Sequence, residues 1–174
     1  MKKFTFVFVL IMIAEILAIH YQWLYPNIQY FTKPLILLSL IAFLLVATKR
    51  NSSVFKRAIL IALLFSLSGD ILLMFEKQNP VFFMFGLGAF LLSHLFYIYS
   101  FNQPEHPSHD IPFLKKHPWF IFLVIVAGVY MFQQLQPKLH EMVLPVIVYL
   151  IVILAMFSMA INRWGKVNKD SFFW

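Results

Sequence analysis

The sequence predicts an all-α fold, a polytopic bundle of transmembrane helices. Hydrophobic residues make up 61% of the 174 residues and charged residues 12%, and the mean hydropathy is +0.81. A soluble domain has fewer apolar residues and about twice as many charged ones. Only helices and closed barrels satisfy their backbone in lipid, and these apolar runs are unbroken rather than alternating. We therefore expect a single integral-membrane helical domain over residues 1–174.

Six apolar segments are long enough to cross a bilayer. The first resembles a signal peptide, but it lacks a small-residue cleavage site and Glu15 interrupts it, so we expect it to be retained. The second opens with Lys33-Pro34, and proline is tolerated in the first turn of a helix. Proline also recurs at Pro145, where a freed carbonyl predicts a kink. The expected spans are residues 4–21, 31–48, 54–75, 81–101, 118–135 and 141–161.

The connections differ in character. Residues 49–57 contain four basic residues, residues 76–80 form a short turn, and residues 102–117 are the longest polar connection. The last residues, 171–174, resemble the first turn of another span, which suggests that the chain is a fragment of a longer one.

Lysine and arginine are distributed unequally between the two sides of the expected bundle. Basic residues concentrate in cytoplasmic loops, so the richer side is cytoplasmic. This places the N-terminus in the cytoplasm, and a bacterial inner membrane is the expected location. Three basic residues fall on the outer side and eleven on the cytoplasmic side: Lys33, Lys77 and Lys138 against Lys2, Lys3, Lys49, Arg50, Lys56, Arg57, Lys115, Lys116, Arg163, Lys166 and Lys169.

Several classes of function are excluded or disfavoured. The chain has no cysteine, which excludes disulfides, thiolate metal sites and a cysteine nucleophile. The net charge of +7 is explained by basic loops beside spans and does not indicate nucleic-acid binding. No phosphate-binding loop, GxSxG or HExxH motif is present. The histidines of residues 102–117 match no metal template. We expect no metal and no cofactor.

Asp70 is the most informative residue. It lies in the apolar run of residues 63–75, and an ionised carboxylate at the centre of a membrane helix costs roughly 2.5 kcal/mol or more. Such a residue is a candidate functional site, although it can also brace neighbouring helices through a hydrogen bond or ion pair. Ser66 lies four residues earlier on the same helical face. Gly69 removes side-chain bulk where another helix can approach closely.

Two further charged residues are expected within the apolar spans. Lys33 lies near the outer end of the second span, where it either pairs with Asp70 or extends its ammonium group to the interface. Glu15 lies near the middle of the first span and should face the interior of the bundle. It is either part of the site or a neutral carboxyl group hydrogen-bonded to a neighbouring helix.

The fourth span carries residues 86, 90, 94, 97 and 101 at helical spacing, so His94 and Tyr97 share a face. Histidine titrates near neutrality and can carry a proton or orient a phosphate. It is also often a structural hydrogen-bonding residue. Tyr149 lies one turn after Pro145 on the sixth span. We expect these residues to line a cavity deeper than Asp70.

Taken together, these segments resemble the YhhN family, also called the lysoplasmalogenase family. The resemblance covers nearly the whole chain, and its elements fall in order on successive spans. They are TKPL at 32–35, FSLSGDILLM at 65–74, FGLGAFLLSHLFY at 85–97 and PVIVY at 145–149.

The resemblance implies a fold of about eight spans and hydrolysis of the vinyl-ether bond of lysoplasmalogens, giving a fatty aldehyde and a glycerophospho-base. The expected partners are a lysophospholipid substrate and the bilayer. The family carries a second aspartate, in a Ser-Asp element on the seventh span, and this chain ends before it. Asp170 precedes the expected seventh span and does not correspond to that residue.

A vinyl ether is cleaved by protonation of its β-carbon, followed by capture of the oxocarbenium ion by water. This chemistry uses a protonated carboxyl group and a carboxylate. We expect Asp70 to be one of them and the aspartate of the seventh span, which the resemblance implies, to be its partner, with Glu15 as the alternative partner. Lys33, Ser66, His94, Tyr97 and Tyr149 are the candidate substrate-binding residues. The alternative function is a proton- or cation-coupled transporter or lipid-binding membrane protein, and a structural membrane subunit is a third possibility.

Overall fold

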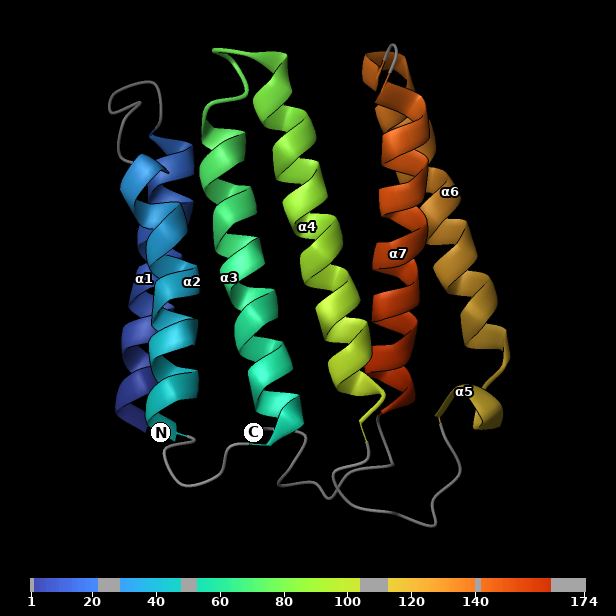
Figure 1. Ribbon diagram of the computed structural model, residues 1–174, viewed down its shortest axis with the longest axis horizontal. Coiled ribbons are helices and arrows are strands. Elements are labelled where there is room, and N and C mark those ends of the chain that lie inside the picture. The colour runs from blue at the N-terminus through green and yellow to red at the C-terminus, as the bar shows by residue number, and fades with distance from the viewer. Residues whose placement is uncertain (1, 22–28, 48–52, 104–112, 140–141, 164–174) are drawn as a thin grey trace. The chain divides into compact units, whose positions relative to one another are not determined.

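The computed structural model describes residues 2–21, 29–47, 53–103, 113–139 and 142–163. Within these residues all regular structure is helical, which confirms the predicted all-α class (Figure 1). The helices are α1 (Lys2–His20), α2 (Gln29–Ala47), α3 (Val54–Met74), α4 (Pro80–Phe101), α5 (Phe113–Lys116), α6 (Trp119–Leu139) and α7 (Val143–Asn162).

Six of these helices fall on the six predicted spans, with ends that differ by a few residues. Among the described residues, α3, α4, α6 and α7 are long and apolar enough to cross a membrane. The apolar parts of α1 and α2 are shorter, Phe4–His20 and Tyr30–Val46. The protein is therefore an integral-membrane helical protein, while six spans and a cytoplasmic N-terminus remain predictions. The short helix α5 lies within residues 102–117, which were predicted to be a polar connection.

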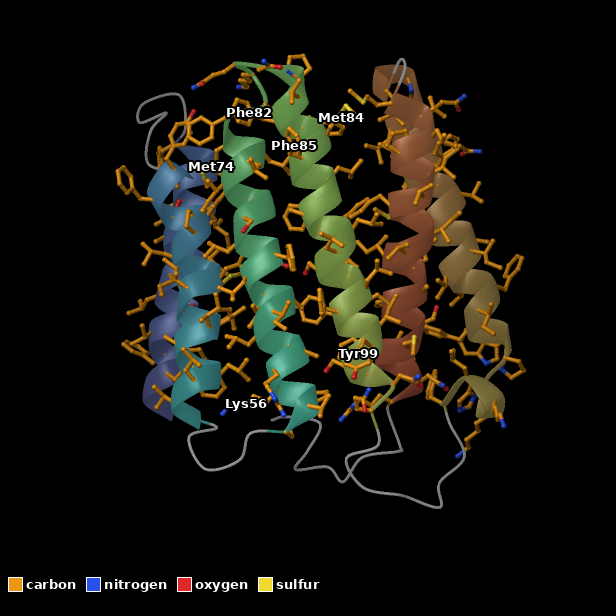
Figure 2. All side chains as sticks on the ribbon, viewed as in Figure 1. Lys56, Met74, Phe82, Met84, Phe85 and Tyr99 are labelled. Atoms are coloured by element: carbon orange, nitrogen blue, oxygen red, sulfur yellow. The ribbon has the colours of Figure 1, made fainter. Side chains whose placement is uncertain are left out.

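Polar side chains fix the starts of the two helices that carry most of the site. Ser53 is the N-cap of α3, where its hydroxyl accepts a hydrogen bond from the Lys56 backbone N–H at 3.2 Å. Asn79 accepts one from the Val81 N–H at 2.9 Å, directly before Pro80 opens α4. Figure 2 shows Lys56 at one end of α3 and Met74 at the other.

Two proline predictions are wrong in detail. Helix α2 begins at Gln29, so Pro34 lies in its second turn rather than its first. Helix α7 begins at Val143, so Pro145 lies in its first turn, where a proline breaks no intrahelical hydrogen bond. The kink predicted at Pro145 therefore has no cause.

The chain divides into two compact units, Met1–Ser93 and His94–Trp174. In the first unit, α1 packs on α2 and α2 packs on α3, so these three helices lie side by side (Figure 1). Phe4 and Phe43 join α1 to α2 through stacked rings whose centroids are 4.0 Å apart. The first unit therefore brings together the three helices that carry Glu15, Lys33 and Asp70.

In the second unit, α6 packs on α7 and α5 lies against α7. The Leu114 N–H of α5 donates a hydrogen bond of 3.2 Å to the Asn162 side-chain oxygen at the end of α7. Large apolar side chains such as Phe122, Leu144 and Ile151 are exposed on these helices. Lipid solvates such side chains as well as a protein core does, so this exposure fits helices in a bilayer.

Candidate functional site

Asp70 lies in the last two turns of α3 and is half-buried. The residue before it, Gly69, is in contact with α4: a Cβ atom built on Gly69 would lie 2.7 Å from the ring of Phe90. A Cβ on Gly86 of α4 would lie 2.8 Å from the side chain of Leu73 on α3. Each glycine thus accepts a large side chain of the other helix. The predicted close approach at Gly69 is confirmed.

A serine cluster joins the same two helices one turn away. The Ser93 hydroxyl donates to the Ala62 carbonyl oxygen at 2.8 Å, and the Ser66 and Ser93 Oγ atoms are 2.7 Å apart. A hydroxyl group has one hydrogen. Because Ser93 uses its hydrogen for Ala62, Ser66 is the donor to Ser93. The hydroxyl hydrogen of Ser66 is therefore used in helix packing, and the Ser66 oxygen can act toward a ligand only as an acceptor.

Ser93 was not among the residues singled out in the sequence, yet it is fully buried. The sequence contains a pattern that could have identified Ser93: Gly86, Ala89 and Ser93 are small and follow one another at helical spacing. In the structure all three are buried. Small residues at such spacing are typical of close contacts between membrane helices.

The charges of two other side chains act on Asp70. They belong to Lys33 on α2 and Glu15 on α1, and both interact electrostatically with the Asp70 carboxylate. The Lys33 side chain is exposed. This exposure fits a lysine that extends toward the membrane interface, and the ion pair with Asp70 stays a prediction.

Glu15 is the most deeply buried of these three residues. Its side chain is 7% exposed, and its Oε2 atom has no hydrogen-bond partner among the described residues. Glu15 thus faces the interior of the first unit, as expected of a carboxyl group in the middle of an apolar helix. A hydrogen bond from Glu15 to a neighbouring helix would not by itself explain why Oε2 has no partner among the described residues, because buried polar atoms are nearly always hydrogen-bonded.

The remaining candidate residues form an aromatic cluster in the second unit. His94 on α4 is buried, and its ring centroid lies 5.4 Å from that of Tyr149 on α7, with the rings nearly perpendicular. Tyr97 lies one turn further along α4, with its ring centroid 6.5 Å from that of His94. Edge-to-face packing at this distance is favourable for aromatic rings. The sequence therefore identified three residues that the structure brings into contact.

The site residues divide between the two units. Asp70, Lys33, Glu15 and Ser66 belong to the first, and His94, Tyr97 and Tyr149 to the second. Within the described residues, no group of three or more histidine and acidic side chains is placed to hold a metal ion. The chemistry available to the first unit is therefore that of two carboxyl groups and one ammonium group in an apolar setting.

Comparison with known proteins gives one match. The model of the YhhN family matches residues 28–174. This range contains Lys33, Ser66, Asp70 and the aromatic cluster, whereas Glu15 lies outside it. No curated protein and no solved structure matches the chain. Since the family model covers most of the chain and the described residues form apolar membrane helices, this protein belongs to the YhhN family.

Proposed function

We propose that this protein hydrolyses the vinyl-ether bond of a lysoplasmalogen within a bacterial inner membrane, releasing a fatty aldehyde and a glycerophospho-base. The observation that carries the proposal is the setting of Asp70: a half-buried carboxyl group on an apolar helix, inside the family-matched range, acted on by a second carboxyl group and a lysine.

The reaction needs a proton, a stabilised cation and a water molecule. A carboxyl group transfers its proton to the β-carbon of the vinyl ether, and the ether oxygen shares the resulting positive charge. Water adds to the cationic carbon and returns a proton to a carboxylate. The hemiacetal then collapses to the aldehyde and the alcohol, with its hydroxyl proton moving to the departing oxygen. Paired carboxyl groups serve related oxocarbenium chemistry in glycosidases.

In this proposal Asp70 is the catalytic carboxyl group and Glu15 supplies the second. Lys33, whose side chain is exposed, binds the lipid phosphate or sets the charge of Asp70. His94, Tyr97 and Tyr149 contact the lipid, and the Ser66 oxygen accepts a hydrogen bond from it. The lysophospholipid and the bilayer are the expected partners, with no nucleic acid and no cofactor.

The test is Asp70→Asn in the full-length protein, reconstituted in lipid, with aldehyde release as the readout. The substitution keeps the shape of the side chain and removes its acid chemistry. We expect a loss of at least about 100-fold in kcat, the lower range for general acid–base catalysis. Glu76→Gln, which changes an exposed carboxyl group after α3, is the matched control and should keep full activity. Retained activity in Asp70→Asn would exclude Asp70 from the chemistry.

A second candidate function is a proton- or cation-coupled transporter. The buried Oε2 atom of Glu15, which has no hydrogen-bond partner among the described residues, favours it, because intramembrane carboxyl groups often carry ions. Uptake of substrate into proteoliposomes driven by a pH gradient, without bond cleavage, would identify the transporter. Aldehyde release without a gradient would identify the hydrolase.

A further inference from the structure

Helix α5 is held at the end of the second unit where α6 begins and α7 ends (Figure 1). On the α7 side, the Leu114 N–H donates to the Asn162 side-chain oxygen at 3.2 Å. On the α6 side, the Phe113 ring lies edge-to-face against the Phe120 ring, with centroids 5.6 Å apart. The Phe113 ring also packs on that of His117, with centroids 4.9 Å apart. A helix of four residues is unstable alone, so these contacts to both neighbouring helices fix its position.

The side chains that α5 exposes are basic. Lys115 and Lys116 form its last turn, and both are exposed. Arg163 follows Asn162 directly at the end of α7 and is half-buried. We call Lys115, Lys116 and Arg163 the basic corner. The described residues of the second unit include no aspartate and no glutamate. The basic corner therefore carries positive charge that no carboxylate in the described part of this unit balances.

Apolar side chains follow the basic corner along α6. Trp119 opens α6, Phe122 lies nearly one turn further on the same face, and both are exposed. Tryptophan is enriched at the level of the lipid headgroups in membrane proteins. Exposed phenylalanine deeper along a membrane helix contacts acyl chains at no cost in hydration. The order of positive charge, interfacial tryptophan and apolar surface matches the order of groups along a phospholipid.

From this arrangement we propose that the basic corner binds the headgroup of an anionic phospholipid, whose acyl chains lie along α6. A zwitterionic phospholipid brings an ammonium group with its phosphate, and the described residues of this unit offer that group no carboxylate. An anionic phospholipid such as phosphatidylglycerol brings a net negative charge instead. Basic side chains between the ends of membrane helices are typical binding sites for anionic headgroups. The site depends neither on Asp70 nor on the proposed hydrolysis.

Native mass spectrometry of the full chain in detergent, titrated with phosphatidylglycerol or with phosphatidylcholine, measures the affinity for each lipid. The wild type should bind phosphatidylglycerol more tightly. Lys115→Gln and Lys116→Gln should each weaken that binding about fivefold, the usual contribution of one lysine at an anionic membrane surface. Arg57→Gln is the matched control, because Arg57 is an exposed basic residue at the start of α3 in the first unit. It should leave the affinity unchanged.

Asn162→Ala separates a positioned site from diffuse surface charge. The substitution keeps every charge but removes the acceptor that holds the Leu114 N–H. It should weaken phosphatidylglycerol binding by about twofold or more, the smallest change expected from one hydrogen bond. The proposal is overturned if the wild type binds both lipids equally, if Arg57→Gln weakens binding as much as Lys115→Gln does, or if Asn162→Ala binds phosphatidylglycerol as the wild type does.

Discussion

Ser93 is the residue on which the polar contact between α3 and α4 depends. Its hydroxyl donates to the Ala62 carbonyl and accepts from Ser66, so it is the central member of a chain of three groups. Both of its partners belong to α3, and Ser93 is fully buried. Loss of this one hydroxyl removes the bond to the Ala62 carbonyl and leaves the Ser66 hydroxyl without its acceptor.

We expect Ser93→Ala to destabilise the protein by about 1 kcal/mol, within the range measured for hydrogen bonds between membrane helices. Thermal unfolding in detergent measures the change. Ser68→Ala is the matched control: Ser68 is exposed and its hydroxyl bonds only the Leu64 carbonyl of its own helix, so its removal should leave the midpoint nearly unchanged. Equal shifts in the two variants would contradict the role given to Ser93.

Single residues differ in how far the sequence alone could place them. Glu15 was expected to face the interior because its carboxyl group is rare in an apolar run, and it is buried. The role of Ser66 in packing could not be predicted, because its partner lies 27 residues away on another helix. Nor could the sequence show that Oε2 of Glu15 has no hydrogen-bond partner in the described part of the chain, since this depends on every neighbouring side chain.

At the level of helices, α3 and α4 contact each other through complementary shapes. Gly69 accepts the Phe90 ring and Gly86 accepts the Leu73 side chain, which lets the two backbones approach closely beside Asp70. Gly88, on another face of α4, has open space where a Cβ atom would lie. Substitution by alanine is therefore expected to have opposite effects on stability at Gly69 and at Gly88.

Gly69→Ala should destabilise the protein by about 1–3 kcal/mol, the usual cost of overpacking a well-packed contact. Gly88→Ala should be neutral or slightly stabilising, because alanine favours the helix more than glycine does. Thermal unfolding of both variants makes the comparison. Combining Gly69→Ala with Phe90→Leu should recover part of the lost stability. A neutral Gly69→Ala would show that α3 and α4 are further apart than described.

Helix positions were predictable because long apolar runs separated by polar residues mark membrane helices in sequence. The residues at which the helices begin and end were less predictable. Helix α2 begins before the predicted residue, which moves Pro34 into the second turn, and α7 begins after it, which moves Pro145 into the first. Such shifts follow from local capping and packing, which hydropathy does not report.

For the whole molecule, orientation follows from the distribution of basic residues. Gln78, before α4, and Asn102, after it, are both exposed and lie at opposite ends of the same helix. Because the chain has no native cysteine, a single introduced cysteine can be labelled selectively.

A membrane-impermeant maleimide should label Gln78→Cys in intact cells. Asn102→Cys should react only after the membrane is permeabilised. The opposite pattern would place the N-terminus outside, and labelling of both in intact cells would contradict a membrane-spanning α4.

The paired glycine and serine contacts have a mechanical consequence. Rotation of α3 about its axis would bring bulkier atoms of α3 against the Phe90 ring, which now fits over Gly69. Sliding of α3 along α4 would break the hydrogen bond between the Ser93 hydroxyl and the Ala62 carbonyl. These two helices therefore move as one rigid pair beside Asp70. An opening that admits a lipid tail to that carboxyl group from within the first unit would therefore displace α1 and α2 rather than separate α3 from α4.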